Sequence, residues 1–108
     1  MEHSQEVYKR FIINFYKEND VLSITTEKGS FSRAELYLAF NKIKEKFLEI
    51  KSSGNSTSLN NAKGNIMVDF TRSENEWLKV STFDIDGFSF DEIELCLDTF
   101  NKNYYGTS

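Results

Sequence analysis

Acidic residues are the groups in this 108-residue sequence whose spacing comes closest to a known chemistry. Asp84, Asp86 and Gly87 form a D-x-D-G motif, which occurs in calcium-binding loops. In the register of such a loop Gly87 takes position six, but Ile93 takes position twelve, which needs a bidentate carboxylate. The motif therefore fails as a calcium site, and we expect no bound metal. A strand end followed by an aspartate-glycine turn explains the same residues.

The single histidine and the single cysteine are the other candidates for catalysis. His3 lies near the N-terminus, where chains fray, whereas a general base must be held rigidly. Cys96 falls on the apolar stripe of the last predicted helix, where a free thiol behaves as a small hydrophobic side chain. The chain has no P-loop, G-x-G-x-x-G, G-x-S-x-G or H-E-x-x-H motif. We therefore expect that the protein is not an enzyme, uses no cofactor and has no catalytic residues.

The charge of the chain is unevenly distributed. Thirteen Lys and Arg residues oppose seventeen Asp and Glu residues, which gives a net charge of -4. The segment between Val80 and Asn101 contains no basic residue and six acidic ones: Asp84, Asp86, Asp91, Glu92, Glu94 and Asp98. Such a block repels nucleic acid and attracts basic partners, so we expect no direct binding of nucleic acid. The alternative is that these acids only form a solvated face that favours solubility.

The N-terminal part predicts a helix and a strand. Apolar residues spaced three and four apart predict a helix over residues 5–18, with Ser4 as its N-cap. That helix would bury Tyr8, Phe11, Ile12 and Phe15. Residues 21–26 are rich in β-branched side chains and predict a strand.

Two further helices have clear beginnings. Ser32 with Glu35, and Ser89 with Glu92, form capping boxes, in which each side chain accepts a hydrogen bond from a backbone N–H at the helix start. They predict helices over residues 33–51 and from Ser89 to about residue 103. Both starts read F-S-x-x-E-[L/I]-x-L. We attribute the likeness to shared capping chemistry, which explains every common position except the final leucine.

The remaining segments predict a loop and a hairpin. Residues 52–65 are polar and aperiodic, which is typical of a flexible loop. Residues 66–71 and 77–85 alternate in polarity and predict an antiparallel hairpin, in which a change of phase near Ser81 and Thr82 indicates a bulge. Trp77 would be a core residue at the end of this hairpin.

These elements predict one small α+β domain over residues 1–108. Their order is α-β-α-loop-β-β-α, with the helices packed on a small, mainly antiparallel sheet. The sequence has no apolar run of the length that a membrane span needs. A reduced cysteine fits a cytoplasmic location, which we expect.

One aliphatic residue falls on the polar face of each predicted helix: Ile13, Leu38 and Leu95. Single exposed aliphatic residues are common, so they need no explanation. The alternative is that they belong to contact surfaces for another protein or for a second copy of the chain.

The absence of catalytic motifs and the acidic segment favour protein binding. In size and charge the chain resembles bacterial toxin-immunity proteins and small phage-encoded inhibitors, although no motif identifies such a family. The resemblance implies neutralisation of a basic partner such as a nuclease toxin. The expected partner-binding residues are Asp84, Asp86, Asp91, Glu94, Leu95 and Asp98. A self-associating or adaptor domain is the alternative, and a metal-dependent enzyme is the third hypothesis.

Overall fold

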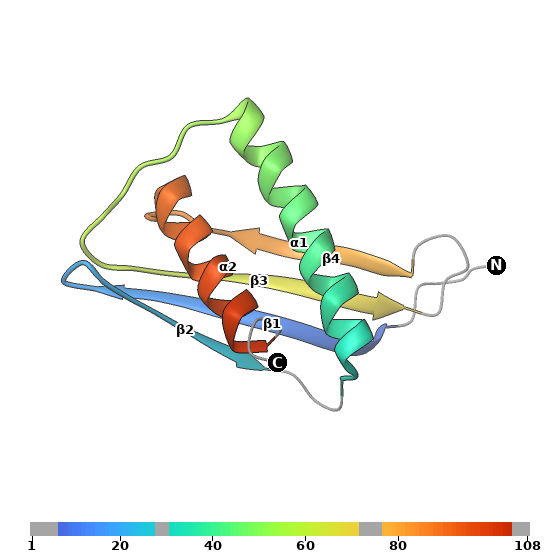
Figure 1. Ribbon diagram of the computed structural model, residues 1–108. Coiled ribbons are helices and arrows are strands. Elements are labelled where there is room, and N and C mark those ends of the chain that lie inside the picture. Colours follow the sequence, from blue (N-terminus) through green and yellow to red (C-terminus); the bar gives the residue numbers. More distant parts are fainter. Residues whose placement is uncertain (1–6, 28–30, 72–76, 105–108) are drawn as a thin grey trace.

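The structure is an α+β fold in which two helices cover one face of an antiparallel sheet (Figure 1). The computed structural model describes residues 7–27, 31–71 and 77–104. In chain order the elements are β1 (Val7–Glu18), β2 (Val21–Glu27), α1 (Arg33–Ser53), β3 (Ala62–Thr71), β4 (Leu78–Asp84) and α2 (Phe90–Tyr104). The strands lie in the order β2-β1-β3-β4, and every neighbouring pair is antiparallel. The fold class is confirmed, but the predicted element order is wrong, because the observed order is β-β-α-β-β-α.

The error lies in the first element, which is a strand and not a helix. Phe11 and Phe15 stand four residues apart, a spacing that places two side chains on the same face of either a helix or a strand. In the structure Phe11, Ile13 and Phe15 are buried together, with none of their surface exposed. Ile13 is therefore a core residue, which overturns the prediction that it lies on a polar face. The predicted cap, Ser4, lies outside the described residues.

A tight turn decides this outcome. Asn19 and Asp20 both have positive φ, 51° and 67°, as in the two-residue type I′ turns that join antiparallel strands. Asparagine and aspartate adopt this conformation more readily than other residues with a Cβ. The turn pairs β1 with β2 from Glu18 opposite Val21 to Ile12 opposite Glu27. Once β1 is a strand, its other edge pairs with β3.

Both predicted capping boxes are present. The backbone N–H of Glu35 donates to the Ser32 Oγ at 3.1 Å, and the Ser32 N–H donates to the Glu35 carboxylate at 2.9 Å. The corresponding distances at Ser89 and Glu92 are 3.1 and 2.8 Å. These bonds satisfy N–H groups that a helix start otherwise leaves without partners.

The two halves of the fold repeat one another. Ser32 and Ser89 lie 57 residues apart, and the same offset relates the start of β2 to that of β4 and the start of α1 to that of α2. It also relates Leu38 to Leu95. The likeness between the two helix starts therefore extends to a repeated β-β-α unit. In the sheet β1 and β3 are central, and the two second strands form the edges.

The core lies between the sheet and the helices. Its buried residues are Phe11, Ile13, Phe15, Leu36, Ala39, Phe40, Ile43, Phe47, Ile66, Val68, Phe70, Leu78, Phe88, Ile93, Cys96, Leu97 and Phe100. Trp77 is not among them: it is 41% exposed and packs one edge against Phe70, so its predicted core position is wrong. None of the helices among the described residues is long and apolar enough to cross a membrane.

The second hairpin has the predicted bulge, and the loop before it is shorter than predicted. Met67 pairs with Thr82 and Val68 with Val80, so Ser81 is the extra residue of the predicted bulge. The segment between α1 and β3 covers only residues 54–61, because the helix and the strand both extend into the predicted loop. Its backbone is bonded to two turns, through Leu59 N–H to Gly87 O (2.9 Å) and Asp20 N–H to Asn60 O (3.0 Å).

Candidate functional site

The outer side of α2 carries four of the six predicted partner-binding residues. Asp91, Glu94, Leu95 and Asp98 are all exposed and lie at helical spacings of three and four, so they share one side of the helix. Leu95 is 58% exposed, and the opposite side of α2 is buried against the sheet. The Glu94 carboxylate lies 3.5 Å from the Lys51 Nζ at the end of α1, so this acid is partly neutralised.

The other two predicted residues, Asp84 and Asp86, lie elsewhere. Asp84 ends β4 and follows Phe83, which packs against the core, so its side chain lies on the face of the sheet without helices. Its Oδ1 accepts a hydrogen bond from the Asp86 N–H at 3.3 Å. Asp86 stands in the turn before α2, where Gly87 adopts a φ of 89° that favours glycine. Asp84 and the four residues on α2 therefore lie on opposite sides of the sheet.

A buried lysine holds the start of α2 in place. Lys17 of β1 has no exposed side-chain surface, and its Nζ donates to the Glu92 Oε1 (2.6 Å), the Ser58 Oγ (2.8 Å) and the Gly87 carbonyl (2.9 Å). All three donors of its ammonium group are thus used. It also lies 5.1 Å from the centre of the Phe88 ring. This network joins β1, the 54–61 segment, the Gly87 turn and α2.

The network keeps Glu92 ionised. Burial acts to raise the pKa of Glu92, but hydrogen bonds from Lys17, from the Ser89 backbone and from Ser58 outweigh it, so the pKa lies below the ordinary value of 4.5. Sequence reasoning missed Lys17 because lysine is almost never fully buried unless it is paired. The apolar residues before it at alternate positions, Ile13 and Phe15, were the available signal.

The start of α1 is held in the same way by the other end of β1. Lys9 Nζ lies 2.9 Å from the Glu35 carboxylate and 5.0 Å from the centre of the Phe31 ring. Hydrogen bonds from Lys9 and from the Ser32 backbone hold the pKa of Glu35 below its ordinary value. Lys9 is more exposed than Lys17, with 29% of its side-chain surface accessible.

A small hollow separates α2 from β2, which we call the α2–β2 hollow. It has a volume of about 140 Å³ and is lined by Leu22, Ser23, Ile24, Leu95, Cys96 and Thr99. Of the predicted partner-binding residues, Leu95 lines this hollow. Leu22 and Ile24 were predicted only as strand residues. The sequence signal for this pair was their alternation in residues 21–26.

Chemistry at Cys96 is disfavoured by its surroundings. Burial, followed by the nearby charge of Glu92, raises the pKa of the thiol to about 11. At neutral pH the group is therefore a thiol and not the nucleophilic thiolate. Among the described residues no three His, Cys, Asp or Glu side chains are grouped so that they could hold a metal ion. His3 lies outside those residues.

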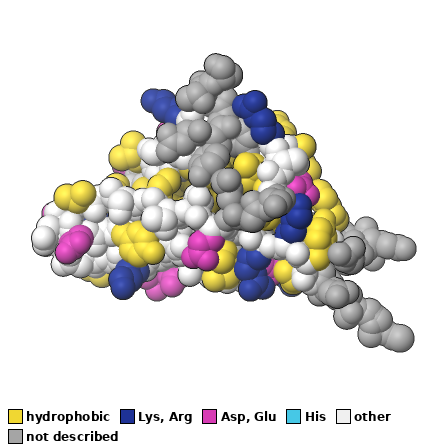
Figure 2. Space-filling view, turned by 90° about the horizontal axis from the view of Figure 1, so that it is seen from below, with side chains coloured by type: hydrophobic (Ala, Val, Ile, Leu, Met, Phe, Trp, Pro, Cys, Tyr) yellow, Lys and Arg dark blue, Asp and Glu magenta, His cyan; other side chains and the backbone are white. Residues whose placement is uncertain are grey.

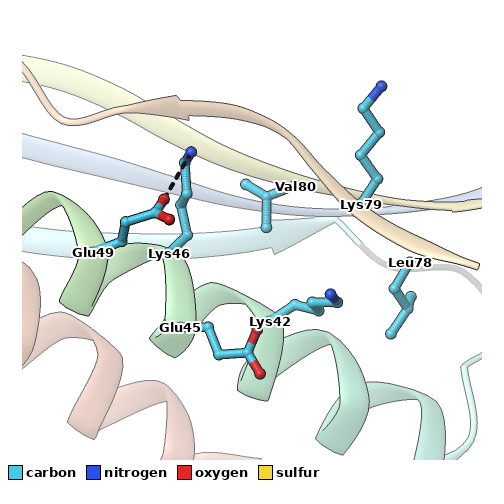
Figure 3. A pocket seen from close by; sticks show the side chains of 7 residues that line it. All are labelled: Lys42, Glu45, Lys46, Glu49, Leu78, Lys79 and Val80. Atoms are coloured by element: carbon cyan, nitrogen blue, oxygen red, sulfur yellow. Dashed lines mark hydrogen bonds and ion pairs between the residues drawn. The ribbon is translucent and has the colours of Figure 1, made fainter. Parts of the chain in front are cut away.

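The hollow at the opposite edge of the sheet has a different chemistry. It lies between α1 and β4, has a volume of about 240 Å³, and is lined by Lys42, Glu45, Lys46, Glu49, Leu78, Lys79 and Val80. Figure 3 shows Lys46 joined to Glu49, at 3.3 Å, while Lys79 points away from α1. The two edges are related by the internal repeat, yet the lining of the α2–β2 hollow has no charged side chain, whereas that of the other hollow has charges of both signs.

The face of the sheet without helices has no single charge sign. Arg10 and Asp69 form a bidentate pair across β1 and β3, with a shortest distance of 2.6 Å, and this contact raises the pKa of Arg10. The surface seen in Figure 2 likewise intersperses basic, acidic and hydrophobic side chains.

Comparison of the chain with protein-family models, with curated proteins and with solved structures found no match.

Proposed function

We propose that the protein is a small acidic protein-binding domain, an inhibitor or immunity-type protein that neutralises a basic partner such as a nuclease toxin. The observation that carries this proposal is the exposed side of α2, where Asp91 and Asp98 flank Leu95. Acidic groups of this kind steer a basic partner and fix its orientation. An exposed aliphatic residue among them supplies the apolar contact that gives an interface its affinity.

The architecture supports a binding role for α2 in a second way. The capping Glu92 is used internally by Lys17 and Ser89, so the helix start is rigidly held without the outer acids. Asp91 and Asp98 make none of the side-chain contacts described above, and the position of Asp91 in the first turn of α2 adds only a favourable interaction with the helix dipole. Their removal should therefore alter binding and leave the fold intact.

The test is a charge reversal with a matched control. Asp91→Lys/Asp98→Lys reverses the outer side of α2, and Glu45→Lys/Glu49→Lys makes the same change in charge on α1. Immobilised wild-type and variant proteins are exposed to lysate of the native host, and each retained protein is purified and titrated by calorimetry at two salt concentrations. The α2 variant should lose at least tenfold in affinity for the true partner, whereas the α1 variant should retain it. Equal binding by all three proteins would contradict the proposal.

Self-association remains the second candidate, on different residues from those first expected. Ile13 is buried and cannot contribute to an interface, whereas Leu38 and Leu95 are 38% and 58% exposed. Sedimentation velocity over a range of protein concentrations decides between the candidates. A neutralising monomer keeps one sedimentation coefficient, while a self-associating domain increases in mass with concentration.

A further inference from the structure

The two edges of the sheet differ in how their backbone groups are protected. β4 carries Lys79 and the bulge at Ser81, and both features discourage pairing with another strand. β2 has neither feature. Its seven residues pair with β1 in an unbroken register, and its only charged residue is Glu27 at the end. Within the described residues, β2 pairs with β1 alone.

The β1–β2 turn determines which backbone groups of β2 point outward. In a two-residue hairpin Glu18 and Val21 form the first hydrogen-bonded pair, and bonded pairs then occur at every second position. The backbone N–H and C=O groups of Leu22 and Ile24 therefore point away from β1. Their side chains lie on the helix side of the sheet, where they line the α2–β2 hollow.

The hollow is of a size and chemistry that suits one apolar side chain. Its volume is about 140 Å³, and an apolar cavity of roughly 150 Å³ accommodates a benzene molecule. Along α2, Asp91 precedes Leu95 by about 6 Å and Asp98 follows it by about 4.5 Å. Lys102 stands one turn beyond Asp98, so the acidic flanks end there.

We propose that β2 binds an extended segment of a protein partner as an added antiparallel strand. The segment places one aliphatic side chain in the α2–β2 hollow and a Lys or Arg two residues away on each side. Alternate side chains of a strand are about 6.6 Å apart, close to the rise of about 6 Å between Asp91 and Leu95 and longer than the rise of about 4.5 Å between Leu95 and Asp98, which the long Lys or Arg side chain spans. Main-chain hydrogen bonds to Leu22 and Ile24 supply affinity, and the hollow and its acids supply selectivity. This inference rests on the proposed function and adds the form in which the partner is recognised.

The test uses the peptide Ac-Thr-Lys-Thr-Val-Thr-Lys-Thr-NH₂ and ¹⁵N-labelled full-length protein. In the added strand, the residues directly opposite Leu22 and Ile24 have their side chains on the helix side of the sheet and their N–H groups toward β2. The Lys and Val residues of the peptide take these positions, so their N–H groups donate to β2. Two further peptides have the same sequence and carry three N-methyl groups each: one at Lys, Val and Lys, and the other at the first three threonines. Methylation alters the peptide alone, so the protein fold is unaffected.

Binding should perturb the amide resonances of Leu22 and Ile24 at up to about 1 mM peptide. Methylation of the Lys and Val residues removes the hydrogen bonds to β2 and should weaken binding by roughly tenfold or more. Methylation of the threonines should leave the affinity unchanged, because those groups point away from β2. On the protein, Leu95→Lys should weaken binding, whereas the equivalent Leu38→Lys on α1 should not.

The outcomes separate this inference from the proposed function. If both methylated peptides bind equally and Asp91→Lys/Asp98→Lys abolishes binding, the acidic surface binds but strand addition is overturned. Absence of any effect on Leu22 and Ile24 at about 1 mM peptide also overturns strand addition, while the affinity for the native partner still decides the proposed function. If the free protein is a dimer with these two amides protected from exchange, a second copy occupies the edge, and the inference is likewise wrong.

Discussion

Replacement of Lys17 by methionine should destabilise the protein severely, because this buried ammonium group is the centre of a four-part network. The change preserves the aliphatic stem but leaves the Glu92 carboxylate without its 2.6 Å partner and the Ser58 Oγ without a donor, while the Gly87 carbonyl keeps only the Leu59 N–H. Loss of one partner of a buried ion pair costs about 3–5 kcal/mol. Glu92 retains 24% of its side-chain exposure, so water can partly replace Lys17. We therefore expect the lower end, a loss of about 3 kcal/mol in the free energy of unfolding.

The assays are urea unfolding and thermal unfolding, both followed by far-ultraviolet circular dichroism. For a domain of this size, 3 kcal/mol corresponds to a decrease in Tm of roughly 12–24 °C. Lys9→Met is the control, because Lys9 forms the same contact with Glu35 but is 29% exposed and should lose about 1 kcal/mol or less. A double-mutant cycle of Lys17→Met with Glu92→Gln should show a strong coupling. The reasoning is refuted if Lys17→Met costs no more than Lys9→Met, or if the cycle shows no coupling.

Three further predictions concern pH, packing and reactivity. Glu35 and Glu92 have pKa values below 4.5 in the folded protein, so the stability they contribute is complete above about pH 4.5 and is lost as pH falls through the lower folded values. The urea midpoint should therefore fall on acidification, and less steeply in Glu92→Gln; an equal slope in both proteins would contradict this. Gly64→Ala should cost about 1–3 kcal/mol in urea unfolding, because its methyl group would overlap the carbonyl oxygen of Asp84; a neutral effect would show that the strands can separate locally. Cys96, with its pKa raised to about 11, should react slowly with a disulfide reagent at about pH 8 and rapidly in urea; rapid reaction of the folded protein would place the thiol at the surface.

The helix starts were predictable because their chemistry is local. Ser32 and Glu35 bond to each other's backbone across three residues, so the capping box needs no distant partner. The bulge at Ser81 was predictable for a similar reason, since the change of phase is visible within one strand. Leu95 was correctly placed on the exposed side of α2 from helical periodicity alone.

The errors arose where two local patterns were compatible with the same residues. Phe11 and Phe15 suit one face of a helix as well as one face of a strand, and the choice depends on pairing with β2 and β3. The burial of Lys17 depends on oxygen atoms from residues 41, 70 and 75 positions away in the chain. The α2–β2 hollow also combines distant segments, so its lining could not be read from either element alone.

The sequence by itself determined the α+β class, the two capped helices, the second hairpin with its bulge, and the acidic outer side of α2, because these follow from contacts within a few residues. Only the tertiary structure decided that residues 7–18 form a central strand, that Ile13 and Lys17 are buried, and that β2 presents an edge beside Leu95. The physical reason is that a strand acquires its hydrogen bonds, and a buried charge its partners, from segments far away in the chain.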